Sequence, residues 1–155
     1  MTDAPETPDV PDTSAHVPRP AMTVAELQAM IESSFPGTKL PYTVESVTAT
    51  TARLRQEIGR FDSRPGGTVS GPTLMTLADL AAWMVIVAQI GPVALSVTTS
   101  LHIDFLRKPD LVDVVAEATL LKLGQRLGVA EVALYSAGSD QMVAKAQVTY
   151  SIPPR

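Results

Sequence analysis

Asp79 is the residue of this chain whose setting most strongly suggests chemistry. It is the only ionisable side chain between Pro65 and Leu101, and it lies in the most apolar segment, residues 73–89. Burial of a carboxylate in apolar surroundings costs free energy unless the group has a partner or a task. Asp79 is therefore either a structural carboxylate, capping or satisfied in the core, or a catalytic group, and its surroundings favour catalysis.

The segment that carries Asp79 has the sequence of a long helix. Ser70 is a favourable N-cap, Pro72 is tolerated in the first turn, and a Gly-Pro pair at 91–92 ends the helix. The helix is apolar on nearly all sides, so we expect other structure to surround it. At Ser70-Gly71, free N–H groups and the helix dipole could stabilise a carbonyl oxygen that becomes negative, although every capped helix has such an end.

The distance from this helix start to Asp79 favours a shared site. Asp79 lies about 10–12 Å along the helix axis from the N-terminus, at about 1.5 Å per residue. A carbonyl held at the N-terminus of one chain would not easily meet Asp79 of the same chain. It could meet Asp79 of a second chain packed antiparallel, so we expect a site formed by two subunits.

Two further groups of polar side chains could bind a ligand. On the strand after the helix, Ser96, Thr98 and Ser100 would share one face, where their hydroxyls could hold a water molecule or a carboxylate. Threonines are also common in strands for their shape alone.

The main basic clusters lie at strand ends and would suit the phosphates of a nucleotide-bearing ligand, although each could equally be a solvated turn. They contain Arg107, Lys108, Lys122 and Arg126, with Gln125 beside the last.

The order of predicted elements indicates an α+β domain. A capping box at Thr23 and Glu26 starts a short helix that should end at residue 34. Alternating runs predict strands at 42–48 and 51–58, and after the long helix at 94–105, 112–123, 127–137 and 141–152. Residues 60–69 should form a loop. The last four strands would form a meander, and thus an antiparallel sheet that curves around the long helix.

The composition excludes several kinds of site. The chain has no cysteine and two histidines, which excludes a thiol nucleophile and a multi-histidine metal site within one chain. The net charge of -4, without a basic patch, argues against a nucleic-acid partner. The sequence also lacks the G-x-S-x-G elbow, the P-loop and the dinucleotide-binding G-x-G-x-x-G.

We expect one domain, residues 22–155, after an acidic, proline-rich tail, residues 1–21, with too little apolar content to pack. The tail lacks the apolar run of a signal peptide, and the absence of cysteine fits a reducing compartment, so we expect a cytoplasmic protein. The long helix approaches the composition of a membrane span. It is short for one and contains Asp79, so we expect it in a protein core and not in a membrane.

Over residues 25–152 the sequence resembles a hotdog-fold acyl-CoA thioesterase of the PaaI-like group. Members carry an Asn, a short loop, His-Gly-Gly and then Leu-Ala-Asp on the central helix. The matching stretch here is residues 64–79, which ends in Leu-Ala-Asp. The Ile-Asp-Phe-Leu-Arg run at 103–107 and the Gly-Gln-Arg turn at 124–126 also follow the family pattern.

The resemblance implies a hotdog fold and a site between two subunits of a homodimer or homotetramer, with no cofactor or metal. Asp79 falls on the catalytic carboxylate, the general base or nucleophile that attacks the thioester by way of water. Gly71 falls on the glycine whose N–H polarises the thioester carbonyl, and Thr98, or Thr99 after a shift by one, on a water-orienting hydroxyl. The residues assigned to substrate binding are Arg64, Thr99, Arg107, Lys108, Gln125 and Arg126.

Three departures from the family pattern keep other functions open. Ser70 stands where the family has His, Pro72 where it has its second Gly, and Arg64 where it has Asn. Ser70 remains in the predicted catalytic group as the helix cap but cannot act as an imidazole. Arg64 could hold a carboxylate, a phosphate or Asp79.

One alternative function is that of a non-catalytic protein that binds acyl-CoA or an aromatic ligand. Another is a hydratase or other acyl-CoA enzyme, which would need a paired Asp and His.

Overall fold

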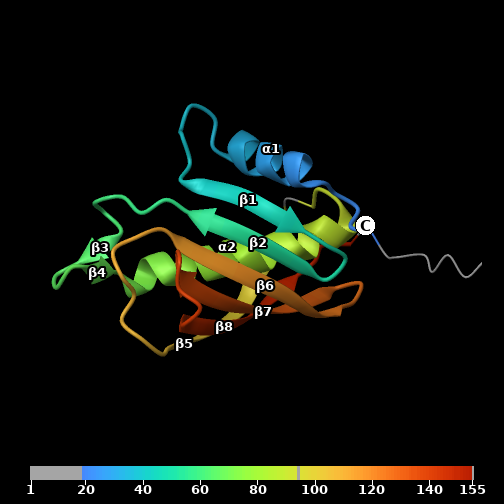
Figure 1. Cartoon of the computed structure of the whole chain (residues 1–155). Coiled ribbons are helices and arrows are strands. Elements are labelled where there is room, and N and C mark those ends of the chain that lie inside the picture. The colour runs from blue at the N-terminus through green and yellow to red at the C-terminus, as the bar shows by residue number, and fades with distance from the viewer. Residues whose placement is uncertain (1–18, 94, 155) are drawn as a thin grey trace, which may run out of the picture.

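The computed structural model describes residues 19–93 and 95–154, in which a six-stranded sheet wraps a long helix (Figure 1). The predicted tail lies almost wholly outside the described residues. The elements are, in chain order, α1 (Val24–Ser34), β1 (Tyr42–Val47), β2 (Thr51–Gln56), β3 (Ser63–Arg64), β4 (Thr68–Val69), α2 (Gly71–Ile90), β5 (Val97–Phe105), β6 (Val114–Leu123), β7 (Leu127–Ser136) and β8 (Met142–Ser151).

The sheet is antiparallel throughout, with the strand order β1-β2-β6-β7-β8-β5. The α+β hotdog architecture predicted from the sequence is therefore confirmed. The predicted meander is right for β6, β7 and β8 but wrong for β5, which pairs with β8. The reason is that β2 already occupies the other side of β6, so β5 can only join the free edge of β8.

α2 lies against the inner face of the sheet and contacts β2, β5, β6, β7 and β8 (Figure 1). Its buried side chains cover most of the circumference of the helix, so the prediction that other structure surrounds it is confirmed except along a partly exposed stripe that includes Asp79, Leu80 and Trp83. α2 has the length and apolar composition of a membrane span, but most of it is buried inside the protein. This is the situation expected of a core helix.

The helix ends follow the local sequence signals. Thr23 and Glu26 form the predicted capping box at the start of α1, and the Ser70 side chain accepts a hydrogen bond from the Thr73 N–H at the start of α2. Gly91, with φ of 89°, caps the end of α2 in a backbone conformation that favours glycine. The predicted loop at 60–69 contains a short hairpin, β3 and β4, which the sequence did not indicate.

The two edges of the sheet differ. α1 lies along β1 (Figure 1), and the Gln28 side chain donates to the Tyr42 carbonyl and accepts from the Val44 N–H, at 3.2 and 2.9 Å. The edge at β1 is thus covered. β5, at the other edge, carries mostly exposed residues along its whole length. An uncovered edge strand is a surface that can pair with another chain.

Gly128 is a point of close approach between β7 and α2. A Cβ atom at this position would lie 2.9 Å from Cδ1 and 3.0 Å from Cγ1 of Ile86. Ile86 is fully buried, so it has no room to move away. The absent side chain at Gly128 therefore allows the sheet to close on the helix.

We predict that Gly128→Ala lowers the free energy of unfolding by roughly 1–3 kcal/mol, because the added methyl overpacks the core at Ile86. Urea denaturation would measure the loss. Gly124→Ala is the matched control, since its Cβ would meet only the Leu127 carbonyl oxygen at an ordinary 3.5 Å. Equal stability of the two variants would contradict this account of the packing.

Candidate active site

The carboxylate of Asp79 is anchored through one of its two oxygens. Oδ1 accepts hydrogen bonds from the Thr98 hydroxyl at 2.7 Å and from the Tyr150 hydroxyl at 2.8 Å. Oδ2 accepts no hydrogen bond from the described residues, and the side chain is partly exposed. Asp79 therefore fits both hypotheses left open by the sequence, a structural carboxylate and a catalytic one. Its Oδ1 has hydrogen-bond partners within the protein, and its Oδ2 is available for chemistry.

Tyr150 is a member of this cluster that the sequence did not predict. Its side chain is 4% exposed, and its hydroxyl also lies 3.2 Å from the backbone oxygen of Asp79. Burial raises the pKa of Tyr150, and the nearby charge of Asp79 raises it further, so the hydroxyl stays protonated and donates. One signal was available: Tyr150 alternates with Val148 and Ile152 on the buried face of β8, where a tyrosine needs a partner for its hydroxyl.

A β-bulge at Thr99 determines which threonine reaches Asp79. Thr98 pairs with Tyr150 across β5 and β8, and Ser100 pairs with Thr149, the next residue back along β8, so Thr99 is the extra residue. Thr98 and Ser100 consequently point to opposite faces, and the predicted common face is wrong. Thr98 meets Asp79, whereas the Thr99 hydroxyl donates to the Thr149 carbonyl at 3.2 Å.

The start of α2 leaves one N–H group free. The Ser70 N–H donates to the Asp62 carbonyl, the Thr73 N–H to the Ser70 hydroxyl, and the Leu74 N–H to the Ser70 carbonyl. Pro72 has no N–H. Among the described residues nothing accepts the Gly71 N–H, which therefore remains available to a ligand at the positive end of the helix dipole.

Asp62 holds this helix start in place, a role that the sequence did not suggest. Its Oδ1 accepts from the Thr73 hydroxyl at 3.1 Å and from the buried Gln56 amide at 3.2 Å, and its Oδ2 accepts from the Gly59 N–H at 2.8 Å. With the bond from Ser70 N–H, at 2.7 Å, these contacts tie α2 to β2 and to the loop after it. Asp62 is thus a structural carboxylate.

A groove of about 650 Å³ opens in front of the Gly71 N–H. It brings together five of the predicted site residues, Arg64, Ser70, Gly71, Arg107 and Lys108. The ring of Phe105 also lies in it, 3.4 Å from where a Cβ of Gly71 would be. The groove therefore combines a free N–H, three cations and an aromatic surface.

The other predicted site residues lie outside this groove. Asp79 and Thr98 form their own cluster about 12 Å further along α2. Gln125 and Arg126 are exposed in the β6–β7 turn, and Thr99 is bonded within the sheet. Within one chain, the carboxylate of Asp79 and the N-terminus of α2 thus lie apart.

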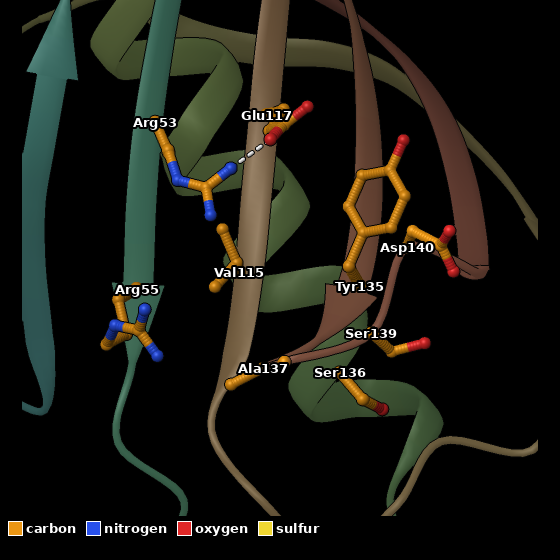
Figure 2. A pocket seen from close by; sticks show the side chains of 10 residues that line it. Arg53, Arg55, Val115, Glu117, Tyr135, Ser136, Ala137, Ser139 and Asp140 are labelled. Atoms are coloured by element: carbon orange, nitrogen blue, oxygen red, sulfur yellow. Dashed lines mark hydrogen bonds and ion pairs between the residues drawn. The ribbon is translucent and has the colours of Figure 1, made fainter.

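A second pocket, of about 290 Å³, lies on the outer face of the sheet, with α2 behind the strands (Figure 2). Arg53 and Arg55 line it, but Glu45 and Glu117 pair with Arg53, and Glu45 pairs with Arg55 at 2.6 Å. These carboxylates neutralise the guanidinium groups, so the pocket offers little net charge to an anion. It does not include Asp79 or Gly71.

The comparisons with known proteins place the chain in a family. The model of the thioesterase superfamily matches residues 66–143. A crystal structure of a candidate thioesterase from Silicibacter is 36% identical, covers 90% of this chain and 97% of that one, and has a TM-score of 0.81. The chain belongs to the thioesterase superfamily. Membership supports thioester hydrolysis as the general activity.

Two more distant structures share the fold of this superfamily member. Zebra fish thioesterase superfamily member 2 is 18% identical, with a TM-score of 0.75 over 86% of this chain and 100% of that one. A thioesterase from Haemophilus influenzae is 16% identical, with a TM-score of 0.74 over 89% and 95%. Among curated proteins there is no match.

We predict that Asp62→Ala lowers the free energy of unfolding by about 1–3 kcal/mol, because it leaves the buried Gln56 amide and the Gly59 N–H without their acceptor. Urea denaturation would measure the change. Asp140→Ala, in an exposed turn, removes the same charge without such contacts and serves as the control. An Asp62→Ala variant as stable as this control would show that the carboxylate does not hold the helix start.

Proposed function

We propose that this thioesterase superfamily member hydrolyses an acyl-CoA to the free acid and CoA, and that Asp79 activates the attacking water. The observation that carries the proposal is the arrangement of its carboxylate, with Oδ1 held by Thr98 and Tyr150 and Oδ2 open. A carboxylate held in this way has a fixed orientation and one free acceptor. Those are the properties that a general base needs.

The proposed hydrolysis uses only water and groups of the protein. Oδ2 of Asp79 takes a proton from water while the water oxygen bonds to the thioester carbonyl carbon. The carbonyl electron pair moves to oxygen, where the Gly71 N–H and the dipole of α2 stabilise the negative charge. The intermediate then collapses, the carbon–sulfur bond breaks, and the CoA thiolate takes the proton from Asp79, which returns to its ionised form.

We infer that the site is completed by a second copy of the chain. Gly71 and Asp79 are eight residues apart on one helix, about 12 Å, so they cannot flank the same carbonyl. The face of α2 that carries Asp79 also carries partly exposed Leu80 and Trp83, and beside it the edge of β5 is uncovered. An antiparallel pairing along β5 would bring Asp79 of one chain toward Gly71 of the other.

The basic residues of the groove support CoA as the leaving group. Arg64, Arg107 and Lys108 line it together with the exposed ring of Phe105. Arg64 donates to the Thr68 hydroxyl through Nε at 3.0 Å, and Arg107 donates to the Met142 carbonyl through one terminal nitrogen at 2.8 Å. Their other nitrogens remain for an anion such as a phosphate. Gln125 and Arg126, in their exposed turn, are proposed to contact CoA held mainly by another subunit.

A non-catalytic binding protein is the second candidate. It is favoured by Ser70, which stands at the family's His position and whose hydroxyl is 2.9 Å from that of Thr73. That hydroxyl serves the helix cap, so it does not replace an imidazole in catalysis.

We predict thiol release from at least one of a panel of short, long and aromatic acyl-CoAs. Asp79→Asn should lower kcat/KM by about 10²-fold or more, because the amide cannot take the proton from water. Asp140→Asn, a neutralised aspartate in an exposed turn, should behave as wild type. Measurable acyl-CoA binding without thiol release would favour the non-catalytic alternative, and full activity of Asp79→Asn would rule out the mechanism.

The shared site predicts complementation between two inactive variants. Asp79→Asn removes the base, and Gly71→Pro removes the N–H at a position where the first helical turn accepts proline. A heterodimer of the two, purified through different tags, should recover about half of the wild-type activity, since one of its two sites is intact. A heterodimer as inactive as both parents would show that Asp79 and Gly71 act within one chain.

A further inference from the structure

We propose that Tyr150 is the positioning residue that fixes which oxygen of Asp79 acts as the base, an inference that rests on the proposed function. Its hydroxyl is 2.8 Å from Oδ1, the oxygen that Thr98 also contacts. With both donors on Oδ1, Oδ2 is the oxygen left to accept the proton of the attacking water.

The position of Tyr150 in the fold makes it the more rigid of the two donors. Its side chain is buried beneath α2 and comes from β8, an interior strand with hydrogen-bonded neighbours on both sides. Thr98 is exposed and comes from the edge strand β5. The cross-strand pairing of Thr98 with Tyr150 places the two hydroxyls side by side, so that the buried phenol orients the carboxylate and the threonine completes its hydrogen bonding.

The two donors together hold the carboxylate in one orientation. Among the described residues, the hydrogen bonds to this carboxylate come from the Thr98 hydroxyl on β5 and the Tyr150 hydroxyl on β8. Removal of the Tyr150 hydroxyl would leave Oδ1 with the exposed Thr98 as its donor, so Oδ2 would no longer be held toward the attacking water.

A purely structural role would have a different signature. The Tyr150 hydroxyl also lies 3.2 Å from the Asp79 carbonyl and could serve only to attach α2 to β8. Its loss would then lower stability, but kcat of the folded enzyme would not change.

The decisive variant is Tyr150→Phe, which removes one oxygen atom and keeps the ring in the core. We expect kcat to fall roughly ten- to a hundred-fold with little change in KM, because a bond to a charged group that orients the base is lost. Tyr135→Phe removes a hydroxyl on the outer face of the sheet (Figure 2) and should match wild type in both respects.

A second measurement tests the contact without relying on activity. Urea midpoints of wild type, Tyr150→Phe, Asp79→Ala and the double variant form a thermodynamic cycle. Tyr150→Phe should destabilise the wild type clearly more than it destabilises Asp79→Ala. If the stability losses of the two single variants simply add in the double variant, the two side chains do not interact and the inference is wrong.

The outcomes separate the two proposals. An active wild type with unchanged kcat in Tyr150→Phe overturns the positioning role and leaves the thioesterase function standing. If the wild type releases no thiol, the proposed function is wrong. If the stability losses in the cycle are then also non-additive, Tyr150 is a structural partner of Asp79 and not a positioning residue.

Discussion

The apolar surface of α2 is the constraint on which the rest of this structure depends. A helix with buried side chains on most sides must be enclosed, and a curved sheet encloses it where a flat one would cover a single face. The glycine at position 128 lets β7 approach Ile86. Because α2 is packed directly against β5 and β8, the meeting of Asp79 with Thr98 and Tyr150 is a result of core packing and does not depend on a flexible loop.

The same packing separates the two halves of the chemistry. The N-terminus of α2 is held by Asp62, and its remaining donors are used within the helix cap, so the Gly71 N–H is left over. Asp79 lies further along the same rigid helix. Since a helix cannot bend back on itself, the proposed mechanism requires, for a carbonyl at Gly71, a carboxylate from elsewhere. We propose that a second copy provides it along the edge strand β5.

Local signals made much of the fold predictable. Capping at Thr23 and Ser70 and the stop at Gly91 depend on neighbours in the sequence, and the structure shows each of them. Alternation of buried and more exposed residues is clear in β2 and β7. The pairing of β5 with β8, the bulge at Thr99 and the contacts of Asp62 and Tyr150 depend on register between distant segments. One extra residue in β5 reverses the faces of Thr98 and Ser100, and alternation alone cannot reveal it.

The departures from the family motif leave the hydrogen bonds of Asp79 intact. Ser70 contributes a helix cap in place of an imidazole, so in the proposed mechanism the charge on a carbonyl oxygen is stabilised by the Gly71 N–H and the helix dipole. Arg64, on the short hairpin, brings a cation to the groove in place of an amide. Both donors to the carboxylate come from the sheet and not from the altered segment. The proposed activation of water therefore relies on residues outside the altered segment, and the groove can change in charge while the support of Asp79 is preserved.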